Sequence, residues 1–155
     1  MDNFSYSHLD GPVKIDKLNE SIRKGNCRLA VQHYFYKTHN IKLKPEDVLC
    51  PKLYQKTGEF VVKSPKSNFF DDLVGGEIVF AERIKSKSGK RLDKSRTQYN
   101  NEKDWSVDLH TAIFLDQDIA KPIWHATIIE GGTCYWTIDK FLEYYKPVAA
   151  KRIKQ

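Results

Sequence analysis

Residues 25–32 read Gly25-Asn26-Cys27-Arg28-Leu29-Ala30-Val31-Gln32, and they predict the start of a helix. Asn26 is a preferred N-cap residue, and Gly25 allows a sharp turn before it. Apolar residues then follow with the spacing of one helical face, at Ala30, Val31, Tyr34 and Phe35. Cys27 therefore falls in the first turn, where a helix N-terminus favours the thiolate, the nucleophilic form of cysteine. The alternative is a cysteine that serves only packing.

Composition and charge are typical of one folded domain. The chain has 155 residues, of which 40% are hydrophobic and 30% charged, enough for a single core. The net charge of +6 suits an acidic partner without identifying it. The first residues lack the basic head and apolar stretch of a secretory signal, and no run of about eighteen apolar residues predicts a membrane span.

The three cysteines are Cys27, Cys50 and Cys134. Their odd number and wide spacing argue against a disulfide framework and favour a reducing compartment. We therefore expect a cytoplasmic location.

Hydrophobic patterning predicts an α+β fold, with N-terminal helices packed on a mostly antiparallel sheet. After an irregular arm (1–14), a short helix capped by Asp16 ends at Gly25, and the Cys27 helix ends near His39-Asn40. A helical turn is expected over 46–54 and a basic loop insertion over 83–105. Thr137 caps a last helix, on which Ile138, Phe141, Leu142 and Tyr145 form an apolar stripe that Pro147 ends. The expected strands are 59–62, 77–81, 108–115, 122–130, 134–136 and 148–153.

Two histidines lie within apolar strands and are candidates for a catalytic site. If the hairpin turns about Gln117-Asp118, then His110 lies directly opposite His125 on the same face, with β-carbons about 5 Å apart. Two imidazoles in contact can act as a base and as the group that orients it. The alternative is a pair of core histidines satisfied by hydrogen bonds.

The other three histidines are expected at the surface. His8 lies in the arm, His33 falls outside the apolar face of the Cys27 helix, and His39 lies at the end of that helix.

Four segments follow the order found in the NlpC-type branch of papain-like cysteine peptidases: Cys27 at the start of a helix, then residues 76–80, 109–115 and 123–126. In that family an Asp-Cys-Ser-Gly segment opens the helix, and a Gly-Asp-hydrophobic strand follows. A His-Val-Gly-Ile-Tyr-like strand supplies the base, and the next strand supplies a polar third residue, often His. The chain resembles this family over about residues 15–153. Asn26 stands at the usual aspartate, and Arg28-Leu29 at the usual Ser-Gly.

This resemblance implies a papain-like fold and a hydrolase that needs no cofactor. It makes Cys27 the nucleophile, His110 the general base and His125 the group that orients His110. The reaction would cleave an amide or peptide bond, for example in a cell-wall-type peptide, through an acyl-cysteine intermediate. A thioester is the alternative bond type. The substrate would be a peptide or amide, and its expected contacts are Asn26, Arg28, Trp105 and Asp108.

Other functions remain open at this stage. The basic tract from Arg83 to Arg96, with Tyr99 and Trp105 nearby, is a candidate site for nucleic acid or an acidic partner, although such a run also fits a solvated loop. A catalytically inactive binding module on the same fold is the corresponding alternative to the enzyme. We expect no metal site, because the cysteines lack the closely spaced ligand pairs of structural zinc sites.

Overall fold

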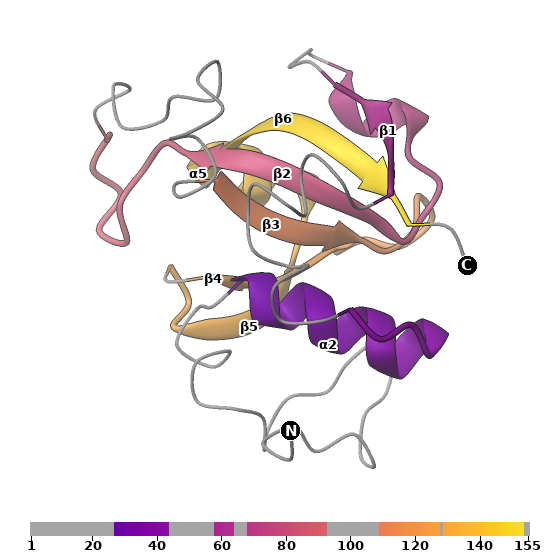
Figure 1. Ribbon diagram of the computed structural model, residues 1–155. Helices are drawn as coiled ribbons and strands as arrows, with labels where there is room; N and C mark the ends of the chain where they lie inside the picture. The colour runs from indigo at the N-terminus through magenta and orange to yellow at the C-terminus, as the bar shows by residue number, and fades with distance from the viewer. Residues whose placement is uncertain (1–26, 44–57, 64–67, 93–108, 128, 154–155) are drawn as a thin grey trace.

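The computed structural model describes residues 27–43, 58–63, 68–92, 109–127 and 129–153, and an antiparallel sheet is their central element (Figure 1). Within these ranges the sheet has six strands in the order β1-β6-β2-β3-β4-β5. Their bounds are β1 Glu59–Val62, β2 Glu77–Arg83, β3 Leu109–Phe114, β4 Ile123–Thr127, β5 Gly132–Trp136 and β6 Tyr145–Arg152. All the neighbouring strands are antiparallel.

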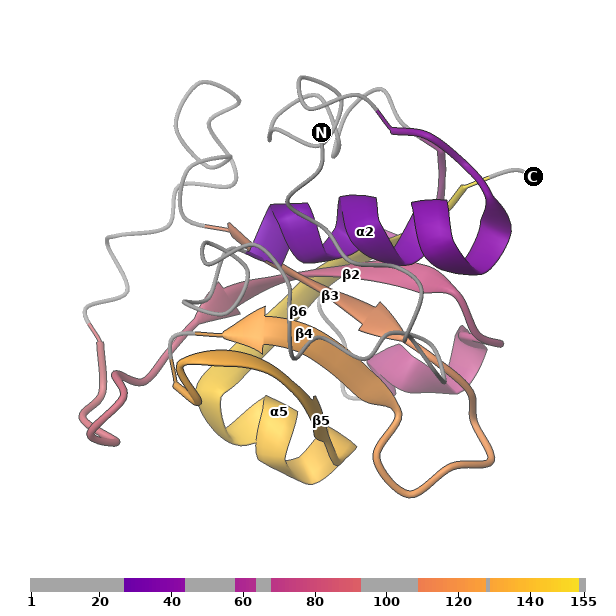
Figure 2. The ribbon, with the colours of Figure 1, turned by 90° about the horizontal axis from the view of Figure 1, so that it is seen from below.

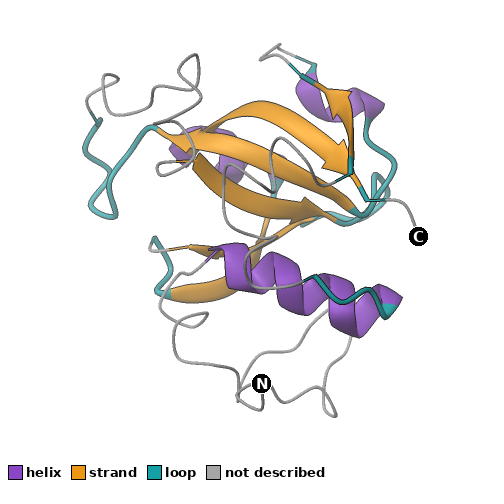
Figure 3. Ribbon diagram, viewed as in Figure 1, coloured by secondary structure: helices purple, strands orange, loops and turns teal. Residues whose placement is uncertain are grey.

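Two helices cover opposite faces of this sheet. The longer one, α2 (Cys27–His39), packs against β3 and β4, and the shorter one, α5 (Ile138–Tyr144), lies on the other side (Figure 2). A 3₁₀ helix, η2 (Phe69–Asp72), precedes β2 (Figure 3). The described chain therefore confirms the predicted α+β class. No described helix has the length and apolar character to cross a bilayer.

On β2, β3 and β4, alternate residues belong to two separate cores, one on each face of the sheet. On β3, Leu109 and Ile113 pack with α2, whereas Ala112 and Phe114 pack with α5. This alternation follows from the two-residue repeat of a strand. Because both faces are covered, all six residues of β3 are buried, which explains why its sequence reads as an almost continuous apolar run.

The predicted C-terminal end of α2 and the predicted N-terminal cap of α5 agree with the structure. Asn40 follows α2 with a φ of 56°, the left-handed conformation that often closes a helix. Thr137 caps α5, because its Oγ1 accepts a hydrogen bond of 3.1 Å from the Lys140 backbone N–H.

The apolar stripe predicted for the last helix is wrong at its end. Leu142 is 41% exposed, and Tyr145 is the first residue of β6 rather than part of the helix. β6 also contains Pro147, at the point where its register against β2 shifts by one residue. A bulge of this kind accommodates proline, which has no N–H to donate to the neighbouring strand.

Several other expectations fall partly or wholly outside the described residues. These are the arm at 1–14, the helix capped by Asp16, the Asn26 cap, the turn at 46–54 and residues 93–105 of the basic loop. The described part of that loop begins after Arg83, which belongs to β2, and Lys85 and Arg91 form an isolated antiparallel bridge.

A buried carboxylate fixes the start of β2. Glu77 is fully buried and accepts hydrogen bonds from the backbone N–H groups of Val74 (2.9 Å) and Gly75 (2.7 Å). Arg152 Nη2 lies 2.7 Å from the same carboxylate. Gly75 adopts a φ of 137°, and a Cβ placed there would lie 2.5 Å from the carbonyl oxygen of Leu115. Only glycine fits this turn without displacing the backbone.

We expect Gly75→Ala to lower the free energy of unfolding by about 3 kcal/mol or more, because it combines a positive φ with a clash against backbone. Gly89→Ala is the matched control: Gly89 also has a positive φ of 87°, but nothing lies within 4 Å of its added Cβ. The control should lose only about 1–2 kcal/mol. Urea unfolding measures both, and equal losses would contradict the steric explanation.

Candidate functional site

A hydrogen bond between two buried imidazoles is the central feature of the candidate site. His110 Nε2 on β3 lies 2.7 Å from His125 Nδ1 on β4, and the ring centroids are 5.0 Å apart. The exposed fractions are 7% for His110 and 1% for His125. The two rings lie on the α5 side of the sheet, since His110 shares the parity of Ala112, and His125 that of Ile123. The predicted contact between the two histidines is therefore present.

The predicted strand register, however, is wrong by two residues. The β3–β4 ladder pairs Ile113 with Trp124 and Phe114 with Ile123. Continued along the strands, this register places Thr127 rather than His125 opposite His110. A shift by two residues keeps each side chain on its face, so the rings meet diagonally, within the reach of aromatic side chains.

The shift has its origin in the loop between the strands. The Leu115 backbone N–H bonds to the Pro122 carbonyl at 2.7 Å, which centres the turn one residue later than predicted. Within the turn, Asp116 Oδ1 accepts from the Asp118 N–H at 2.9 Å. Gln117 Nε2 donates to the Phe70 carbonyl at 2.6 Å and so ties the loop to η2.

Aromatic side chains hold both imidazoles in place. His110 stacks on Tyr145, with centroids 4.2 Å apart and planes at 19°, and Tyr145 in turn stacks on Phe141 of α5 at 5.0 Å. His125 meets the Trp136 ring edge-on at 4.5 Å. Tyr145 Oη and Thr127 Oγ1 are hydrogen-bonded at 2.5 Å. These contacts restrict the rotation of both imidazole rings. A histidine that acts as a base needs such a fixed orientation.

Burial keeps both histidines neutral near pH 7. It is the main cause that lowers the pKa of His110 well below 6.5, and the charges of His125 and Arg83 lower it further. Burial likewise lowers the pKa of His125 to about 3, with a contribution from Lys140. Burial raises the pKa of Tyr145, so its hydroxyl stays protonated.

The hydrogen bond leaves one nitrogen on each ring without a partner. His125 Nε2 is buried and has none among the described residues. His110 Nδ1 also forms no hydrogen bond there. If His110 Nε2–H donates to His125 Nδ1, then His110 Nδ1 carries a free lone pair and His125 carries its proton on Nε2. In this tautomer His110 can accept a proton at Nδ1.

Cys27 lies at the same end of the sheet as the histidine pair. It is the first residue of α2 and is partly buried, and α2 begins beside the start of β3 and the end of β4 (Figure 2). Burial is the main cause that raises the pKa of Tyr145, and a negative charge at Cys27 would raise it further. Tyr145 therefore connects the surroundings of Cys27 with the His110 ring on which it stacks.

Direct contact between Cys27 and the histidines is absent from the described chain. No hydrogen bond joins Cys27 to either ring there, and α2 packs on the sheet face opposite to the one that carries them. Of the expected substrate contacts, Asn26, Trp105 and Asp108 lie outside the described residues, as does the side chain of Arg28.

Sequence reasoning missed three residues of this site. Tyr145 was assigned to the last helix, Arg83 to a loop, and Thr127 to no role. Arg83 ends β2 opposite Tyr145 of β6, is partly buried and has no carboxylate partner in the described chain. Arg83 lies two residues after Ala81 and so on the same face of β2, and Ala81 pairs with His110. This two-residue spacing is the sequence signal that points to Arg83.

His33 and Cys134 also differ from simple expectation. His33 is completely buried rather than at the surface. Cys134 lies opposite His125 on the neighbouring strand β5, and burial, followed by the charge of Glu130, raises the pKa of its thiol to about 12. Among the described residues, no group of three or more His, Cys, Asp or Glu side chains could hold a metal ion.

The depressed histidine pKa values predict a loss of stability in mild acid. An unfolded histidine binds a proton near pH 6.5, whereas folded His125 stays neutral down to about 3. Between these two pH values the unfolded state therefore binds more protons than the folded state. As the pH is lowered, the free energy of unfolding decreases by up to about 1.4 kcal/mol per pH unit for each such histidine. Urea unfolding between about pH 7 and pH 5, where carboxylates stay ionised, measures this slope. His125→Gln should flatten it, and an unchanged slope would contradict burial as its cause.

The sequence was also compared with known proteins. No protein-family model and no curated protein matches it.

Proposed function

We propose that the protein is a cysteine hydrolase that cleaves an amide or peptide bond through an acyl-cysteine intermediate. Cys27 is the nucleophile, His110 the general base, and His125 the residue that positions His110. The observation that carries the proposal is the buried 2.7 Å hydrogen bond between the two imidazoles. It leaves His110 Nδ1 without a partner in the described chain. His110 is the second residue of β3, and α2 begins beside the start of that strand (Figure 2).

In the first half of the reaction His110 Nδ1 takes the proton of the Cys27 thiol while Sγ attacks the carbonyl carbon. This step requires Sγ to reach Nδ1 around the end of the sheet, because α2 packs on the opposite face. The tetrahedral intermediate collapses when the C–N bond breaks, and the imidazolium gives its proton to the leaving amine. In the second half His110 removes a proton from water, which attacks the thioester carbon. Collapse then releases the carboxylic acid and restores the thiol.

His125 acts through its acceptor nitrogen. By receiving the His110 Nε2–H bond, it fixes the tautomer and rotation of the base and stabilises the imidazolium that forms. Its own low pKa, about 3, means that it remains a neutral acceptor throughout. The backbone N–H of Cys27 is a candidate oxyanion donor, because the first N–H groups of a helix have no partner within the helix.

Arg83 supports a preference for anionic substrates. It faces the same side of the sheet as His110, its charge lowers the pKa of His110 after burial and His125, and it has no carboxylate partner in the described chain. A partly buried guanidinium binds carboxylates strongly. We therefore include in the proposal an acidic group on the substrate close to the scissile bond.

Selective alkylation tests the nucleophile and its base. We expect iodoacetamide at about pH 7 to modify Cys27 much faster than Cys134, whose thiol pKa of about 12 leaves little thiolate. His110→Gln should slow the modification of Cys27 by about tenfold to a hundredfold, since it removes the base. Peptide mapping by mass spectrometry reads each cysteine separately.

Two serine variants complete this test. Cys134→Ser should leave the fast phase unchanged, and Cys27→Ser should abolish it. Equal and slow labelling of the cysteines in a folded protein would reject the hydrolase in favour of an inactive binding module, the more so if the protein were retained on nucleic acid in a salt-dependent manner.

The charge of the alkylating reagent tests Arg83. Iodoacetate should alkylate Cys27 faster than iodoacetamide, although free thiols show no such preference for the anion. Arg83→Gln should reduce the rate ratio of the two reagents by about fivefold or more. Lys87→Gln removes an equal charge from an exposed position and should leave the ratio unchanged. A ratio that Arg83→Gln does not alter would refute the role of this residue.

A further inference from the structure

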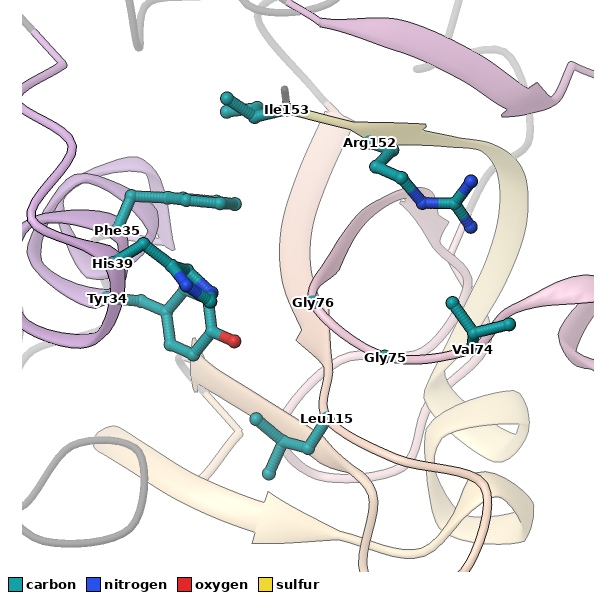
Figure 4. A pocket seen from close by; sticks show the side chains of 9 residues that line it. All are labelled: Tyr34, Phe35, His39, Val74, Gly75, Gly76, Leu115, Arg152 and Ile153. Atoms are coloured by element: carbon teal, nitrogen blue, oxygen red, sulfur yellow. The ribbon is translucent and has the colours of Figure 1, made fainter. Parts of the chain in front are cut away.

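A hollow lies at the far end of α2, away from Cys27. It has a volume of about 460 Å³, and it is enclosed by α2, the turn before β2 and the ends of β3 and β6 (Figure 4). This volume is in the range of small-molecule sites. Its lining residues on α2 follow Cys27 by seven to twelve positions, so the hollow is about 10–18 Å from Cys27 along the helix axis.

Tyr34 presents an unpaired hydroxyl to this hollow. The side chain is only 4% exposed, and its Oη has no hydrogen-bond partner within the described residues. Figure 4 shows the hydroxyl pointing into the space between α2 and the turn that contains Gly75 and Gly76. Burial, together with the charge of Glu77, raises the pKa of Tyr34 to about 12, so the group is a neutral donor at physiological pH. The ring is buried while the hydroxyl opens into the hollow, where a ligand can supply the hydrogen-bond partner that the described residues do not.

The turn leaves the space opposite Tyr34 open. A Cβ at Gly76 would lie 3.8 Å from Tyr34 Oη and 4.0 Å from His39 Nε2, so the missing side chain would occupy the hollow itself. His39 is held against Tyr34 at 5.5 Å between centroids and forms no hydrogen bond in the described chain. Two side-chain donors therefore converge on the same volume.

The polar groups that face the hollow are mostly donors, which favours a ligand with acceptor oxygens. The Glu77 carboxylate is engaged by two backbone N–H groups and balanced by Arg152. Arg152 uses one nitrogen for that contact, and its side chain is 48% exposed at the rim, which leaves further N–H groups for a ligand. Phe35, Leu115 and Ile153 provide apolar walls.

We propose that this hollow binds a small carboxylic acid with an aromatic or branched apolar body. The carboxylate accepts from Tyr34 Oη, His39 and the free N–H groups of Arg152, and the apolar body packs on Phe35 and Leu115. This site is separate from the proposed hydrolase centre, and its occupancy does not depend on that activity.

Titration with phenylacetate and phenylacetamide, monitored by ¹H–¹⁵N NMR of the full chain, tests the proposal. Phenylacetate should shift the amide signals of Gly75, Gly76 and the second half of α2, with saturation at millimolar concentration or below. The amide has the same shape without the charge and should bind about tenfold more weakly. Equal binding of the two compounds, or no saturable shift, would overturn the proposal.

A pair of tyrosine variants locates the site. Tyr34→Phe removes only the hydroxyl and should weaken phenylacetate binding by about fivefold to tenfold. Tyr36→Phe is the matched control, because Tyr36 lies on the same helix with its ring against Lys42, outside the hollow. An equal effect of both variants, or none of Tyr34→Phe, would refute this location. We do not substitute Arg152, because its removal would leave the buried Glu77 carboxylate without its ion-pair partner.

Discussion

The hydrogen bond between His110 and His125 is the interaction on which the candidate site depends. It lies where the β3–β4 ladder no longer pairs residues, so side chains rather than backbone join the two strands there. Burial makes the charged form of either imidazole unfavourable, and the two rings remain compatible as neighbours because one donates while the other accepts. Tyr145 and Phe141 then fix the geometry by stacking. The base that we propose would thereby be positioned before any substrate arrives, as acyl transfer requires.

The face of each strand residue could be predicted from sequence, whereas the register could not. Parity is a local property: His110 and Ala112 share a side whichever residues they oppose. Register depends on how the loop closes, and here contacts from η2 influence that closure, since Gln117 binds the Phe70 carbonyl. No local pattern records a contact across 47 residues. The same-face prediction held because a two-residue shift preserves parity, and a shift by one residue would have separated the rings.

The residues around the histidines were harder to predict than the histidines themselves. Tyr145 continues the helical spacing of Phe141, and the sequence alone favours a helix through both residues. Strand pairing with Arg83, some 60 residues earlier in the chain, draws Tyr145 into β6 instead. Tertiary pairing thus overrides a local periodicity. Arg83 is missed for the complementary reason: its neighbours in sequence form a polar tract, but its partner across the strands is Tyr145, which stacks on His110.

Buried polar groups at the two ends of the sheet differ in their hydrogen-bond partners, and this difference bears on their roles. At the start of β2, Glu77 is satisfied by two backbone N–H groups and Arg152, so the fold alone accounts for its presence. At the other end, His125 Nε2 is buried without a partner in the described chain, which carries a desolvation cost. An apolar pair of similar size would fill this position without that cost. This cost is consistent with the proposed proton transfer, in which His110 Nδ1 is the accepting nitrogen and His125 Nε2 carries a proton.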